Sequence, residues 1–162
     1  AHKTERGLVR LNLNTEEAVQ EAADELLSSV TADDGDVTLL VSEQIRGNRE
    51  LIVGLVRDEQ FGPCVMLGIG GILAEAVADV AFRLAPLSSS EASDLIDDLS
   101  MQSLLDSFRG EPAVDREALI NVLCVLGDLG SDQEILSVDL NPLIVANGVP
   151  IAVDALVETV EG

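Results

Sequence analysis

EILSVDLNPLIVANGVPIAVDALV, residues 134–157, consists of two alternating apolar segments joined by Asn147-Gly148. Asn-Gly between alternating apolar segments is the strongest short sequence signal for a hairpin with a two-residue turn. With such a turn, Asn141 falls directly across from Asp154. The sequence therefore predicts an antiparallel hairpin that ends the chain.

Three oxygen-bearing side chains are expected on one face of this hairpin. Directly opposed side chains share a face with their Cβ atoms about 5 Å apart, and Asp139, two residues before Asn141, points the same way. Two carboxylates and an amide oxygen suit Mg²⁺, which leaves its other positions to water and substrate phosphates. The alternative is that Asp139 and Asn141 form a turn and Asp154 is a surface acid. Pro142 lacks an N–H, so the ladder is expected to break or bulge just before Asn141.

The remaining chain shows clustered strands and clustered helices, which favours an α+β fold over an alternating parallel sheet. Alternation predicts strands at 7–13, 36–43, 50–58 and 62–70. Helical periodicity predicts helices at 15–30, 88–99 and 115–130. Asn14 with Glu17, and Ser88 with Glu91, have capping-box spacing.

A glycine cluster follows the second strand of the predicted pair. Gly68, Gly70 and Gly71 predict a sharp bend or a close approach of another group to the backbone. No internal repeat or long linker interrupts the sequence, so residues 1–162 are expected to form one compact domain.

Acidic residues dominate the charge: 30 Asp and Glu against 9 Lys and Arg give a formal net charge of −21. A nucleic-acid partner needs a basic face, so this class is excluded. Because the acids are spread along the chain, they indicate a halophilic source, since molar salt shortens the Debye length to ~3 Å. This hypothesis predicts a higher melting temperature in molar KCl than in dilute buffer, and equal temperatures would contradict it.

Two cysteines, Cys64 and Cys124, lie in apolar segments without CxxC spacing. They are interpreted as small core residues of a reducing compartment rather than as a disulfide or a metal site. The amino terminus shows no signal peptide, and the longest apolar stretch is too short to span a bilayer. We therefore expect a soluble, cytoplasmic protein with no membrane partner.

Several segments resemble the ATP-grasp domain of ADP-forming acyl-CoA and acetyl-CoA synthetases, which is similar to the succinyl-CoA synthetase β chain. The similar segments are VDLNPLIV and VPIAVDALV in the hairpin, residues 49–87, residues 109–123 and the amino-terminal HKTERGLVRL. The resemblance covers nearly the whole chain. It implies an ATP-grasp fold, a mixed or antiparallel sheet with packed helices, in which the first subdomain is incomplete because the family's amino-terminal segment has no counterpart here.

The resemblance also implies roles for single residues. Asn141 and Asp154 match the positions that hold the magnesium of the bound ATP or ADP. Glu43 and Glu50 resemble the contacts near adenine and ribose, although without the family they are surface residues at strand ends. Arg83 is a candidate phosphate contact or, equally, half of a structural salt bridge.

The only histidine, His2, resembles the phosphoryl carrier of the acetyl-CoA branch, where Lys3 would help to neutralise phosphate. Neutral imidazole suits this role as a nucleophile, although by position alone His2 is an ordinary terminal residue. The family's Gly-Gly pair becomes Gly7-Leu8 here, which puts the phosphate loop in doubt.

Three functions follow as hypotheses. The first is the nucleotide-binding part of an ADP-forming acyl-CoA synthetase, inactive without the missing segment and a CoA-binding α subunit or domain, in a hetero-oligomer or a fused chain. The second is a non-catalytic regulatory or assembly module, like related domains fused to acetyltransferases. The third is a truncated remnant. Neither the carboxylic acid nor a preference for ADP over GDP can be read from the sequence.

Overall fold

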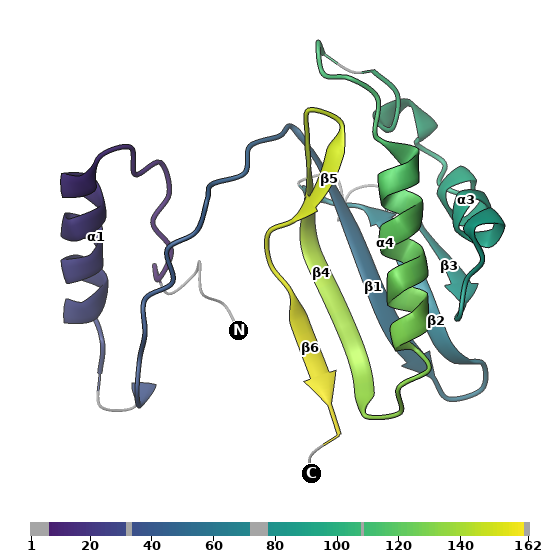
Figure 1. Ribbon diagram of the computed structural model, residues 1–162, viewed down its shortest axis with the longest axis horizontal. Helices are drawn as coiled ribbons and strands as arrows, with labels where there is room; N and C mark the ends of the chain where they lie inside the picture. Colours follow the sequence, from purple (N-terminus) through teal and green to yellow (C-terminus); the bar gives the residue numbers. More distant parts are fainter. Residues whose placement is uncertain (1–6, 32–33, 72–77, 108, 161–162) are drawn as a thin grey trace. The chain divides into compact units, whose positions relative to one another are not determined.

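The computed structural model describes residues 7–31, 34–71, 78–107 and 109–160, in two compact units, Ala1–Gln44 and Ile45–Gly162 (Figure 1). Each unit is described by itself. That residues 1–162 act as one domain stays a prediction. No helix among the described residues is long and apolar enough to cross a membrane.

The α-helix among the described residues of the first unit is α1 (Glu16–Ser28), close to the predicted span. Its N-cap is Thr15, whose hydroxyl accepts a hydrogen bond from the Ala18 backbone N–H, and not Asn14 as the sequence predicted. The Asn14 side-chain amide instead donates to the carbonyl of Asn12. The capping box with Glu17 was therefore wrong by one residue, because both candidate caps can accept a hydrogen bond and local geometry selects one.

The strands predicted at 7–13 and 36–43 were wrong for the part of the first unit that the structure describes, where neither segment has a ladder partner. Side chains of the second segment remain in water: Leu40 is 92% and Val41 is 74% exposed. Alternation of apolar and polar residues gives a segment an apolar face, but a strand also needs a neighbouring strand that takes up its backbone hydrogen bonds.

The second unit is an antiparallel sheet covered by helices on one face, which confirms the α+β prediction (Figure 1). The strand order is β3-β2-β1-β4-β5, and β6 also pairs with β4. The strands are β1 (Arg49–Asp58), β2 (Gly62–Ile69), β3 (Val80–Leu84), β4 (Ile135–Ala146), β5 (Val149–Ala152) and β6 (Leu156–Thr159).

The covering layer consists of α3 (Ser89–Asp97), the short 3-10 helix η3 (Gln102–Leu104) and α4 (Arg116–Leu129). The capping box of Ser88 and Glu91 is confirmed in α3. Asp115 caps the start of α4 and Gly130 ends it, as predicted. These caps hold the helices at the lengths needed to place their apolar stripes on the sheet.

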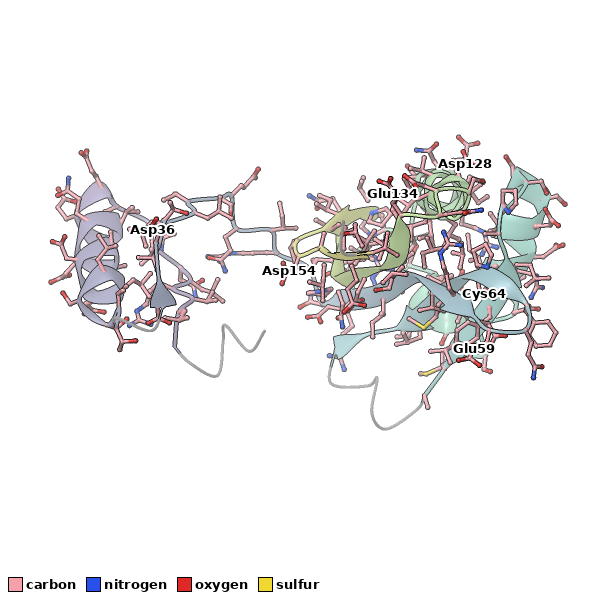
Figure 2. The ribbon with its side chains drawn as sticks, turned by 90° about the horizontal axis from the view of Figure 1, so that it is seen from below. Asp36, Glu59, Cys64, Asp128, Glu134 and Asp154 are labelled. Carbon is pink, nitrogen blue, oxygen red and sulfur yellow. The ribbon has the colours of Figure 1, made fainter. Side chains whose placement is uncertain are left out.

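The core lies between this helical layer and one face of the sheet. Alternate residues of β1, namely Leu51, Val53 and Leu55, are at most 2% exposed and face the helices. The residues between them, from Glu50 to Val56, face the other side, which we call the open face. Figure 2 shows the same division, with Asp128 of α4 above the sheet and Cys64 of β2 below it.

The predicted hairpin turn is confirmed. Asn147 and Gly148 join β4 to β5 with φ angles of 51° and 88°, both in the left-handed region. This is the backbone of a type I′ turn, which matches the twist of the two strands that it connects.

Candidate functional site

The terminal hairpin keeps the predicted register on both sides of an interruption. Leu143 pairs with Ala152 in β5, and Asp139 pairs with Leu156 in β6. Between these pairs only the Val153 N–H bonds across, to the Pro142 carbonyl at 3.2 Å. The break that the missing N–H of Pro142 predicted is therefore present.

A β-bulge in β4 lies at the same place. Leu143 pairs with Leu51 of β1 and Leu140 pairs with Val53, so Asn141 and Pro142 together oppose one residue, Ile52. Bulges are frequent beside functional sites because they redirect side chains. Here the bulge lets β4 keep its apolar residues toward the helices on both sides of the interruption.

Asp139 lies on the open face, opposite Gly54 of β1. A Cβ atom at position 54 would lie 3.1 Å from the Val138 carbonyl oxygen, so only glycine fits without a shift of the neighbouring chain. Gly54 was not singled out from the sequence. A signal was present, since a glycine inside the apolar segment ELIVGLVRD is typical of close backbone approach.

Asp154 influences the ionisation of Asp139. The pKa of Asp139 is raised, first because surrounding protein removes water from the carboxylate and second because Asp154 is negatively charged. Both effects disfavour the ionised form, and a cation bound between the two groups would reverse the second. The Asp154 carboxylate also accepts a hydrogen bond from the Ala155 N–H at 3.1 Å.

The donor set fits magnesium better than a metal held wholly by protein. Among the described residues, no group of three His, Cys, Asp or Glu side chains is placed to hold a metal ion. Two carboxylates and the Asn141 amide oxygen match the few protein ligands that Mg²⁺ takes when phosphate and water complete its shell.

Glu50, the predicted nucleoside contact of β1, lies on the same open face, opposite Ile144. The glycine cluster crosses it closely: the Gly70 N–H donates to the Glu50 carbonyl at 2.8 Å, and a Cβ on Gly71 would lie 3.3 Å from Glu50 Oε2. This confirms the close approach predicted for the cluster. Glu50 and Gly54 are four residues apart, about 13 Å along the strand, so an extended ligand is needed to reach both Glu50 and Asp139.

The remaining predicted site residues are Glu43, His2, Lys3 and Arg83. Glu43 is exposed in the first unit. His2 and Lys3 lie outside the described residues. Arg83 forms the structural salt bridge, with 2.5 Å between its Nη2 and Asp98 Oδ2.

Comparison with known proteins shows what this arrangement is similar to. The model of the ATP-grasp domain family matches residues 1–159. The β subunit of acetate–CoA ligase (ADP-forming) I from Pyrococcus furiosus is 35% identical over 158 residues, 95% of this chain and 68% of the relative. The acetate–CoA ligase (ADP-forming) I of Archaeoglobus fulgidus is 37% identical over 88% of this chain, but the match covers only 21% of that relative.

Among solved structures, acetyl-coenzyme A synthetase 1 of Ca. Korarchaeum cryptofilum matches with a TM-score of 0.85 and 40% identity. The match covers 98% of this chain and 71% of that one. That structure contains coenzyme A and Mg-AMPPCP, with a phosphohistidine segment pointing towards the nucleotide binding site.

Proposed function

Since this chain belongs to the ATP-grasp family, in the branch of the β subunits of ADP-forming acetate–CoA ligases, we propose that it is the nucleotide-binding part of an ADP-forming acyl-CoA synthetase. The reaction is acid + CoA + ATP ⇌ acyl-CoA + ADP + phosphate. The observation that carries the proposal is the position of Asp139 on the open face, two residues from Asn141 in the bulge, with a raised pKa to which burial and the charge of Asp154 contribute.

Asp139, Asn141 and Asp154 would hold Mg²⁺, which when bound neutralises charge on the nucleotide phosphates. Glu50 accepts hydrogen bonds from the ribose hydroxyls or the adenine amino group, and Glu43 adds a second such acceptor. Phosphoryl transfer of this kind depends mainly on positioning and charge neutralisation.

His2 would act as the phosphoryl carrier. Its neutral ring nitrogen would attack the γ-phosphorus of ATP, so that a P–N bond forms as the P–O bond to ADP breaks; in the reverse direction an ADP oxygen takes the phosphoryl group as the P–N bond breaks. His2 would exchange this phosphoryl group with a histidine of the CoA-binding partner. The positive charge of Lys3 would partly neutralise the negative charge of the phosphoryl group at His2. The CoA and the carboxylic acid bind to a partner subunit or to a further domain of a fused chain.

Calorimetric titration of Mg-ADP in molar KCl tests the metal assignment. Asp154→Ala should weaken binding at least about tenfold, because losing one carboxylate from so small a donor set leaves the ion poorly held. Glu158→Ala is the matched control, since it removes a carboxylate from β6 that bonds to Ser137 instead. Its affinity should stay within about threefold of the parent chain.

The same titration, repeated at several pH values, should show an affinity that changes with pH in a defined direction. Mg²⁺ binds the ionised form of Asp139, whose pKa is raised in the metal-free protein. Affinity should therefore fall as pH drops through that raised value, above the range of an ordinary aspartate, and Asp139→Asn should weaken binding and remove this dependence. Equal affinities of the parent chain and Asp154→Ala would refute the assignment. No binding by either would mean that this chain alone is an incomplete nucleotide site.

A further inference from the structure

The open face carries a second feature, an apolar hollow beside the candidate magnesium site. The hollow has a volume of about 390 Å³, and its apolar lining comes from the β1–β2 hairpin and the edge strand β3. The apolar lining residues are Val56, Phe61, Cys64, Phe82 and Leu84.

Two of the three phenylalanines of the chain line the hollow. The sequence has three phenylalanines and no tryptophan or tyrosine. Phe61 and Phe82 both line this hollow, and they are 69% and 49% exposed. Because the chain has so few aromatic side chains, two that are exposed at one place are two that do not pack in the core. Exposed aromatic residues clustered within a polar surface are typical of protein interfaces.

The hollow is next to the candidate magnesium site in the sheet. Val56 pairs with Ser137, and Gly54 pairs with Asp139, so Val56 and Asp139 are diagonal neighbours on the open face. Such neighbours are about 7–8 Å apart. A macromolecule seated in the hollow would therefore lie within one side-chain length of the phosphates that Asp139 is proposed to face.

The position of the hollow, beside the phosphate end of the proposed nucleotide site, indicates which kind of polypeptide would bind there. In the Ca. Korarchaeum cryptofilum synthetase a phosphohistidine segment points towards the nucleotide binding site, and in the proposed function a histidine of the CoA-binding partner has to reach the phosphoryl group that His2 exchanges with the nucleotide. The Archaeoglobus relative extends far beyond the part that this chain matches, and in the Pyrococcus relative the corresponding part is a separate subunit. An apolar surface beside the phosphate end is where such a polypeptide can be anchored without covering the metal ligands themselves.

We propose that this hollow is the docking surface for the CoA-binding part of the ligase, which inserts an apolar side chain over Cys64, between Phe61 and Phe82. The inference rests on the proposed function. The charged lining residues are Asp58 and Arg83, and Arg83 is paired with Asp98. The charge left at the rim is that of Asp58 and the neighbouring Glu59, which favours a basic residue beside that side chain in the partner. Figure 2 shows Glu59 and Cys64 together on the side of the sheet away from α4.

The test measures complex formation with the purified CoA-binding polypeptide encoded with this chain, as a separate subunit or as a domain of one reading frame. Leu84→Glu places a charge in the hollow, and Val125→Glu places one on α4. The two side chains are matched in exposure, at 55% and 53%. Leu84→Glu should raise the Kd at least about tenfold, and Val125→Glu should change it less than about twofold.

Cys64 supplies a second readout at the bottom of the hollow. In a Cys124→Ser background, its reaction with a small disulfide reagent should slow at least about tenfold when the partner is saturating. An unchanged reaction rate in the saturated complex, equal Kd values for the two glutamate variants, or no complex with the parent chain would overturn the proposal. A homodimer that Leu84→Glu dissociates would also overturn it, by making a second copy the occupant.

Mg-ADP binding is measured separately on Leu84→Glu and should stay within about twofold of the parent, since the substitution leaves the hairpin ligands in place. A complex that depends on Leu84, in a chain whose Mg-ADP affinity is unchanged by Asp154→Ala, would preserve the docking surface and remove the proposed metal site. The two failures are therefore distinguishable.

Discussion

Arg49→Met should lower the free energy of unfolding of the chain by about 3–5 kcal/mol, the loss expected when one partner of a buried ion pair is removed. Arg49 is 5% exposed at the start of β1. Its Nε donates to Glu111 Oε2 at 3.2 Å, and its Nη atoms donate to the carbonyls of Leu104, Asp106 and Pro112 at 3.2, 2.9 and 2.5 Å.

The large effect follows from how many groups lose a partner at once. Methionine fills a similar length but donates no hydrogen bond, so Glu111 Oε2 and the carbonyls of Leu104, Asp106 and Pro112 lose the guanidinium. Glu111 Oε1 keeps its hydrogen bonds from Asn48. That loop lies against the β1 residue preceding Glu50, so its loosening also affects the open face. Urea unfolding at constant molar KCl measures the loss.

Arg116→Met is the matched control. Arg116 pairs with Asp97 at the surface, where both side chains are well exposed. Such pairs contribute about 0–1 kcal/mol. A loss below about 1 kcal/mol for Arg49→Met would mean that water replaces the guanidinium without cost, and that the loop is not held by it.

Local signals predicted the parts of the fold that short segments determine. Asp115 and Gly130 mark the ends of α4, and Ser88 with Glu91 begins α3, because each cap is decided by atoms within one helical turn. The Asn147-Gly148 turn was predictable for the same reason. The register that follows from this turn predicts Asn141 opposite Asp154, and the pairs on either side of the interruption keep that register.

The features that the sequence did not predict depend on distant partners. The bulge at Asn141 and Pro142 arises because β4 pairs with β1 and with β5 and β6 at the same time. Pro142 indicated that the pairing would break there, but it did not indicate that Asn141 and Pro142 would together oppose Ile52. Likewise, the four acceptors of Arg49 come from residues at least 55 positions away. A single sequence gives no direct signal for such contacts.

The failed strand predictions have the same cause. The segments at 7–13 and 36–43 alternate as well as β1 does, but β1 has β2 and β4 as neighbours. Alternation describes which side chains could share a face. The ladder forms only where another strand supplies the hydrogen bonds and a second layer covers the apolar side.

Gly148→Ala should lower the free energy of unfolding by about 3 kcal/mol, well above the ordinary cost of adding a methyl group in a turn. Gly148 has φ of 88°, and a Cβ there would lie 2.6 Å from the Ala113 carbonyl oxygen. The Gly148 carbonyl also accepts a hydrogen bond from the Asp115 N–H at 2.7 Å. The turn is therefore docked against the start of α4, and a methyl group would force the two apart.

Gly62→Ala separates the two causes of this loss. Gly62 ends the turn between β1 and β2 with φ of 82°, but a Cβ there would meet nothing within 4 Å. Gly62→Ala should lower the free energy of unfolding by only about 1–2 kcal/mol, the cost of an alanine in the left-handed region. Urea unfolding measures the loss of unfolding free energy in both variants. The amount by which the loss for Gly148→Ala exceeds the loss for Gly62→Ala is the contribution of the contact with Ala113. Equal losses would show that this contact relaxes freely, and that the hairpin carrying Asn141 and Asp154 is held by its strand ladders rather than by docking on α4.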